Sequence, residues 1–96
     1  MSALLAELNA PSKVSRNDDI VLRGKFDGLA QPHLVKVFFN DEEIDGHVYT
    51  DQQGFFQAEF PAKVNKAGNY PIRIVMVENT ESGTEVSGET TIRVTR

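Results

Sequence analysis

The sequence lacks cysteine and tryptophan, and it contains only two histidines and two methionines. Without cysteine, the chain has no disulfide framework, no thiolate metal site and no cysteine nucleophile. Long apolar runs are also missing. The N-terminal SALLAEL is short, carries Glu7 and has no basic flank, so we expect neither a signal peptide nor membrane insertion.

Basic residues are outnumbered, with 10 Lys and Arg against 14 Asp and Glu and a formal net charge of −4. Nucleic-acid binding depends on basic side chains that displace counterions from phosphate, so we expect no nucleic-acid partner. The 96 residues are 40% hydrophobic and include six phenylalanines. This is enough for the core of one domain.

Apolar residues recur with a period of two, which predicts β-strands. In DIVLRGKF, Ile20, Leu22 and Phe26 share one face. Later runs place the following residues inward: Val35, Val37, Phe39, Phe56, Ala58, Phe60, Tyr70, Ile72, Ile74, Met76, Ile92 and Val94. With a first strand near 8–14 and a short one near 47–49, seven strands result. We expect residues 1–7 to form a leader or a short helical turn and residues 8–96 to form a single domain.

Several motifs resemble an immunoglobulin-like domain of the bacterial surface-repeat and phage-virion kind: VLRGKFDG, KVFFNDEEI, TDQQGFFQAEFP, KAGNYPIRIVMVEN and GETTIRV. They are similar to its successive B, C, E, F and G strands, and Tyr70 in AGNY is similar to the tyrosine corner. The disulfide pair and core tryptophan of antibody domains are absent, and the loop ENTESGTEVSG is longer than in bacterial repeats. The resemblance implies an all-β, seven-stranded antiparallel sandwich with Greek-key connections.

The acidic stretch NDEEIDGHVYTD has two interpretations. Residues that match the first, third, fifth and sixth positions of a calcium-binding loop are Asp41, Glu43, Asp45 and Gly46. The twelfth position, however, is the neutral Gln52, and no helix is predicted on either side. A tight turn at Asn40-Asp41 between two antiparallel strands accounts for the stretch better, although a calcium site of another kind between loops stays open.

Side chains suited to catalysis or metal binding are few. A zinc site would need both His33 and His47, and we expect these at different heights of the sandwich, as exposed loop residues. The serines lie in predicted loops or the leader, without a histidine and acid beside them. We therefore expect no enzyme activity, no metal and no cofactor.

Two surfaces are candidates for protein contact. If the third, sixth and seventh predicted strands pair, one outer face carries Lys36, Phe38, Arg73, Val75, Val77 and Arg93. This face is either a docking patch or an ordinary sheet surface on which Lys and Arg stems cover apolar neighbours. The second candidate is the predicted loop between Glu78 and Glu89, which includes Glu81 and Glu85.

These observations predict a protein that works by binding or display. The resemblance implies a protein-binding module of a larger assembly, either a capsid-decoration or tail-accessory domain of a virion or a repeat of a bacterial surface protein. A glycan-binding module is the alternative, with Phe38, Tyr49 and Phe55 as the aromatic rings available for stacking on a sugar. A small metal-binding protein is the third possibility.

Overall fold

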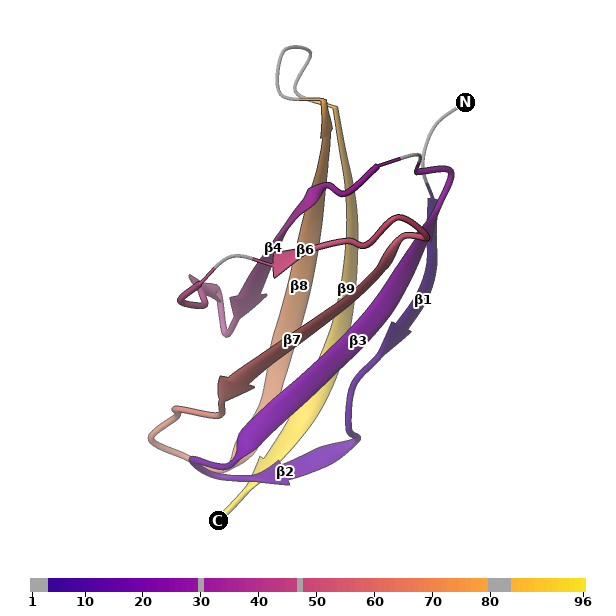
Figure 1. The fold of residues 1–96 in the computed structure, drawn as a ribbon. Coiled ribbons are helices and arrows are strands. Elements are labelled where there is room, and N and C mark those ends of the chain that lie inside the picture. Colours follow the sequence, from indigo (N-terminus) through magenta and orange to yellow (C-terminus); the bar gives the residue numbers. More distant parts are fainter. Residues whose placement is uncertain (1–3, 30, 47, 80–83) are drawn as a thin grey trace.

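The chain folds into two stacked β-sheets (Figure 1). The computed structural model describes residues 4–29, 31–46, 48–79 and 84–96. A three-stranded sheet has the order β1-β3-β7 and contains β1 (Leu4–Asn9), β3 (Asp19–Asp27) and β7 (Phe55–Pro61). The larger sheet has the order β2-β9-β8-β4-β5 and contains β2 (Lys13–Ser15), β9 (Thr84–Thr95), β8 (Gly68–Asn79), β4 (Leu34–Phe39) and β5 (Glu42–Glu43).

The short strand β6 (Val48–Tyr49) also pairs with β4, beyond β5 along the same edge. All pairs are antiparallel except β2 with β9. The chain crosses between the sheets at five connections, from β1 to β2, β2 to β3, β3 to β4, β6 to β7 and β7 to β8, and such crossings are typical of a Greek-key sandwich. No stretch of the described chain forms a helix capable of crossing a membrane.

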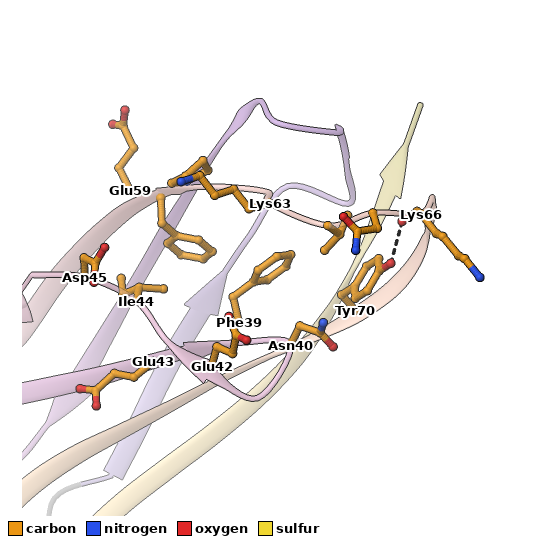
Figure 2. A pocket seen from close by; sticks show the side chains of 14 residues that line it. Phe39, Asn40, Glu42, Glu43, Ile44, Asp45, Glu59, Lys63, Lys66 and Tyr70 are labelled. Atoms are coloured by element: carbon orange, nitrogen blue, oxygen red, sulfur yellow. Dashed lines mark hydrogen bonds between the residues drawn. The ribbon is translucent and has the colours of Figure 1, made fainter.

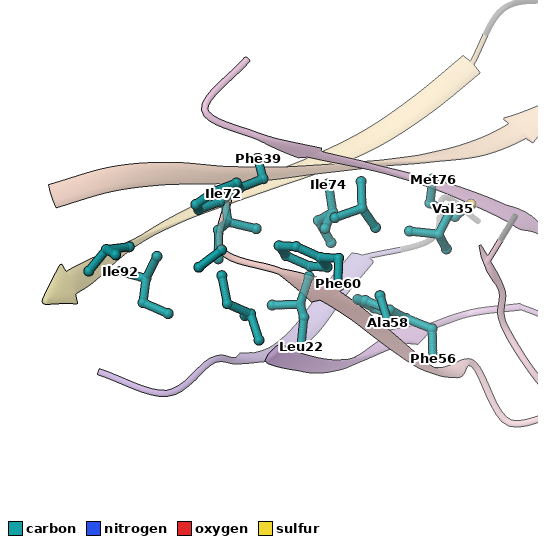
Figure 3. Close-up of a cluster of buried hydrophobic side chains, with 14 of the residues drawn as sticks. Leu22, Val35, Phe39, Phe56, Ala58, Phe60, Ile72, Ile74, Met76 and Ile92 are labelled. Atoms are coloured by element: carbon teal, nitrogen blue, oxygen red, sulfur yellow. The ribbon is translucent and has the colours of Figure 1, made fainter. Parts of the chain in front are cut away.

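The core lies between the sheets and is built by the alternation seen in the sequence. Every residue predicted to point inward is buried except Tyr70, which is half-buried. Figure 3 shows the apolar side chains of β4 and β8 facing those of β3 and β7. The rings of Phe26 and Phe56 lie 5.4 Å apart, and those of Phe39 and Phe60 lie 5.6 Å apart. The aromatic pairs thus join the two strands of one sheet and bridge the two sheets.

The expected leader or helical turn at residues 1–7 is wrong where the structure describes it, because Leu4–Asn9 form β1 against β3. The single strand expected at 8–14 is likewise divided between β1 and β2, which belong to different sheets. Pro11 between them cannot donate to a ladder, so the pairing ends there and the chain changes sheets. Leu5 packs over Gly88 of β9, where a Cβ would overlap the leucine. This contact is distant in sequence and overrides the local helical tendency.

The acidic stretch forms the predicted hairpin. Asn40 and Asp41 join β4 to β5, and Phe39 is paired with Glu42. Both turn residues have positive φ, 53° and 66°, which is the conformation of the type I′ turns that suit the twist of a two-residue hairpin.

The prediction of a loop from Glu78 to Glu89 is largely wrong. Strand β8 continues to Asn79 and β9 begins at Thr84, so the two form a long hairpin that extends beyond the rest of the sandwich (Figure 1). Gly, Ser and Thr dominate this part of β9, and their turn-like composition hides a strand whose alternation is set by pairing with β8.

Candidate functional site

The outer face of the larger sheet brings together most of the predicted contact residues. Lys36 of β4 is paired with Val75 of β8, and Phe38 is paired with Arg73. Val77 follows on the same side of β8. These five residues therefore form one continuous surface, which we call the outer face.

Arg93 does not join this cluster. Its partner in β8 is Asn69, and on its other side it is paired with Lys13 of β2. Arg73 is paired instead with Glu89, four residues before Arg93 along β9. Since a strand rises about 3.3 Å per residue, Arg93 lies well away from Arg73, toward the opposite end of the sheet.

The outer face is partly covered by its own long side chains. The Arg73 guanidinium carbon lies 4.9 Å from the centroid of the Phe38 ring, within the range of a cation–π contact. Val75 is only 9% exposed although it points away from the core. The centre of the face is thus apolar, with Lys36 and Arg73 exposed around it.

Three glutamates lie beside the basic residues of the outer face, where the sequence did not predict them. Glu43 is paired with Phe38, Glu89 with Arg73 and Glu85 with Val77. Glu85 was predicted in a mobile contact loop, but it belongs to β9 and to this face. Glu81, the other predicted loop residue, lies outside the described residues. The face is therefore mixed in charge, with basic and acidic side chains beside one another.

Tyr70 makes the contact that a tyrosine corner requires. Its hydroxyl donates a hydrogen bond of 2.6 Å to the carbonyl of Lys66, four residues earlier. Its ring lies 5.9 Å from that of Phe39. The pair fixes the entry of β8 against the end of β4.

A groove that the sequence did not reveal lies between the β4–β5 hairpin and the chain that follows β7 (Figure 2). Its volume is about 830 Å³. Apolar side chains line its floor: Phe39, Ile44, Phe60, Val64 and Tyr70. Figure 2 shows Glu43, Asp45 and Glu59 at one end and Lys66 with Tyr70 at the other. The acidic stretch thus contributes one wall of a groove, which the sequence could not show because the opposite wall comes from a later part of the chain.

Within the described ranges, no three His, Asp or Glu side chains come together as metal ligands. The Nδ1 atom of His33 lies 3.2 Å from the carbonyl oxygen of Val77, and His47 lies outside the described residues. The Asp51 carboxylate accepts hydrogen bonds from the main-chain N–H groups of Gln53 and Phe55, at 2.8 and 3.0 Å. Asp51 therefore has a structural role in the turn before β7.

The three aromatic residues considered for sugar stacking differ in their surroundings. Phe38 is half-buried beneath Arg73. Tyr49 and Phe55 are 59% and 48% exposed and line the same hollow, of about 430 Å³. Lys25 lies 5.1 Å from the centroid of the Phe55 ring.

The sheet order, the crossings between sheets and the Tyr70 contact define an immunoglobulin-like β-sandwich domain. No protein-family model matches the sequence, and no curated protein matches it. The fold is nevertheless shared with solved structures. The crystal structure of the CARDB domain of the PF1109 protein from Pyrococcus furiosus, in complex with di-metal ions, matches with a TM-score of 0.58 and 17% identity, over 97% of this chain and 87% of that one.

Two further structures agree with this assignment. The solution NMR structure of the same CARDB domain matches with a TM-score of 0.59 and 18% identity, over 97% of this chain and 94% of that one. CopC from Methylosinus trichosporium OB3b matches with a TM-score of 0.55 and 13% identity, over 98% and 94% of the two chains. At such low identities these likenesses show the fold alone.

Proposed function

We propose that this protein is a non-enzymatic binding module that holds a partner protein on the outer face of its larger sheet. The observation that carries the proposal is an apolar stripe on the solvent side of the larger sheet, where the half-buried Phe38 and Val77 lie on either side of Val75. This stripe is bordered by exposed side chains of both charge signs. An apolar centre with a polar rim is the arrangement found in protein interfaces.

The proposed setting is a larger surface assembly, either a virion, as a decoration or tail-accessory domain, or the extracellular surface of a bacterium. Support comes from the resemblance of the strand motifs to domains of this kind and from the elongated form of the molecule, 43 Å in its longest dimension and 18 Å in its shortest. An elongated sandwich presents a long sheet face to a neighbour without needing a deep pocket.

A unique cysteine tests the proposal, because the natural chain has none. Ser87 is exposed and is paired with Val75, so Ser87→Cys places a photo-crosslinker at the centre of the outer face. Asp19→Cys, exposed on the other sheet, is the matched control. With the particle or envelope fraction of the source organism, we expect one crosslinked structural protein from Ser87→Cys and none from the control.

A charge reversal provides an independent check. Lys36→Glu with Arg73→Glu should reduce crosslinking in the Ser87→Cys background about tenfold, since reversed rim charges slow association. The control pair, Arg23→Glu with Lys25→Glu, makes the same change in net charge on the opposite sheet. It should leave crosslinking from Ser87→Cys unchanged. Equal crosslinking from the two cysteine positions, or equal loss in the two charge variants, would contradict the proposed surface.

Glycan binding is the second candidate, and one observation favours it. Tyr49 and Phe55 line the same hollow as Arg23 and Gln57, whose side chains are joined by a hydrogen bond of 3.2 Å from Nε to Oε1. Exposed rings beside fixed polar groups can stack on and hydrogen-bond to a sugar. A glycan array with the wild-type protein and Phe55→Ala tests this. Binding that disappears in Phe55→Ala supports it, and an array without a bound glycan refutes it.

A further inference from the structure

Strand β7 forms an open edge of the three-stranded sheet. Among the described residues, its only strand partner is β3. The neighbouring β6 belongs to the other sheet, where it pairs with β4. An edge strand carries unpaired main-chain groups that can accept another strand.

The hydrogen bonds at the two ends of β7 determine which groups face outward. The Phe26 N–H donates to the Gly54 carbonyl at 2.9 Å, and the Ala62 N–H donates to the Asp18 carbonyl at 2.9 Å. In an antiparallel ladder, residues that bond to the partner strand alternate with residues that do not. Even-numbered residues of β7 therefore bond to β3, and the main-chain groups of Gln57 and Glu59 point toward the open side.

The open edge is bounded at both ends. The N–H and carbonyl of Phe55 are occupied by Asp51, through its Oδ1 atom at 3.0 Å and its N–H at 2.8 Å. Pro61 has no N–H, and its carbonyl accepts a hydrogen bond from Lys63 at 3.0 Å. Two donors and two acceptors, on Gln57 and Glu59, remain for a partner strand.

The groove of Figure 2 continues from this edge. Glu59, Phe60 and Pro61 at the end of β7 form part of its wall. A strand added beside Gln57 and Glu59 would therefore run on over an apolar floor. The groove is lined by four carboxylates and two lysines: Glu42, Glu43, Asp45, Glu59, Lys63 and Lys66. Its charge favours a basic occupant.

We infer that β7 is a docking edge for an extended, basic segment of a partner protein, which adds to the sheet as a strand and places a large apolar side chain in the groove. Main-chain hydrogen bonds supply affinity in this mode of recognition, and the side-chain pocket supplies specificity. A second copy of this chain is a poorer occupant, because symmetric pairing would bring two identical acidic sets together. This surface shares only Glu43 with the outer face, and no test variant of either proposal changes Glu43, so either proposal can fail without the other.

Hydrogen exchange and peptide selection together test the inference. A library of random linear peptides of about twelve residues, long enough to pair and to cross the groove, is selected on the wild-type protein. We expect enrichment of peptides that alternate apolar residues with Lys or Arg. The amides of Gln57 and Glu59 should exchange rapidly in the free protein and at least about tenfold more slowly with a selected peptide.

A substitution at the centre of the edge isolates the main-chain contact. Gln57→Pro removes the outward N–H and leaves the bonds to β3, because proline is tolerated on the open side of an edge strand. Gln57→Ala removes the same side chain and keeps the N–H. Peptide binding should be lost in Gln57→Pro and retained in Gln57→Ala. If Gln57→Pro does not fold, the exchange of the wild-type amides still decides the question.

The charge of the groove is tested by reversing two of its carboxylates. Glu42→Lys with Asp45→Lys should weaken a selected basic peptide about tenfold. The matched control is Glu85→Lys with Glu89→Lys, on the outer face, which should leave binding unchanged. Selection of no peptide, of acidic peptides, or of peptides that leave the two amides unprotected overturns the inference. So does concentration-dependent protection of these amides in the free protein, which would show that a second copy occupies the edge.

Discussion

Two glycines with the same backbone conformation and different surroundings allow a sharp prediction about stability. Gly46 has a φ of 90° and Gly54 a φ of 92°. A Cβ added at Gly46 would meet nothing within 4 Å, whereas one added at Gly54 would overlap the carbonyl oxygen of Phe26. The Phe26 carbonyl cannot move away easily, because the N–H of the same residue donates a hydrogen bond of 2.9 Å to the Gly54 carbonyl.

The expected losses follow from these surroundings. Gly46→Ala should lower the free energy of unfolding by about 1–2 kcal/mol, which is the cost of placing a residue with a Cβ in a left-handed backbone conformation. Gly54→Ala should lose the same backbone contribution and a further amount of about 1–3 kcal/mol from overpacking, because main-chain atoms of Phe26 must move to make room for the Cβ. In a domain of this size each kcal/mol lowers the melting temperature by about 4–8 °C. Urea unfolding followed by far-UV circular dichroism measures both free energies and suits a chain without tryptophan.

The decisive quantity is the difference in the free energy of unfolding between Gly54→Ala and Gly46→Ala. Gly54→Ala should be the less stable by more than about 0.5 kcal/mol, the usual error of such differences. Equal losses would show that β3 and β7 can separate at this turn without cost. That result would also weaken the inference about β7, which depends on a rigid strand beginning at Phe55.

Three further predictions concern the corner, the hairpin and metals. Tyr70→Phe should lower the free energy of unfolding by about 1 kcal/mol, because it removes the hydrogen bond to Lys66; an unchanged urea midpoint would contradict this. Asp41→Gly should raise stability by up to about 1 kcal/mol, since φ is 66° there and Asn-Gly is the preferred type I′ sequence; a lower midpoint would show that the aspartate stabilises the turn. Calcium or zinc at about 1 mM should leave the melting temperature unchanged, because a ligand that binds only the folded state must raise it; a rise would reveal a metal site.

The core was predictable because it depends on a local signal. A period of two places one set of side chains on each face of a strand, and burial selects the apolar set. The inward residues of β3, β4, β7 and β8 follow this rule. The hairpin at Asn40-Asp41 was equally local, since two turn residues between strands determine its geometry.

The errors arose where pairing partners distant in sequence decide the structure. Leu4–Asn9 became a strand because β3 offers a ladder and Gly88 leaves room for Leu5. Residues 84–89 became a strand because β8 pairs with them, although their composition is typical of a loop. Neither partner is visible within a short window of sequence.

The sequence by itself determined the inward faces, the tight turn and the absence of any cysteine chemistry, because each depends on residue type and near neighbours. Only the tertiary structure decided the surfaces. It separated Arg93 from Arg73, added Glu43, Glu85 and Glu89 to the outer face, and formed the groove from the acidic hairpin and the chain after β7. A surface is a set of residues from several strands, and its composition depends on strand order and register, which are fixed only when the whole sandwich packs.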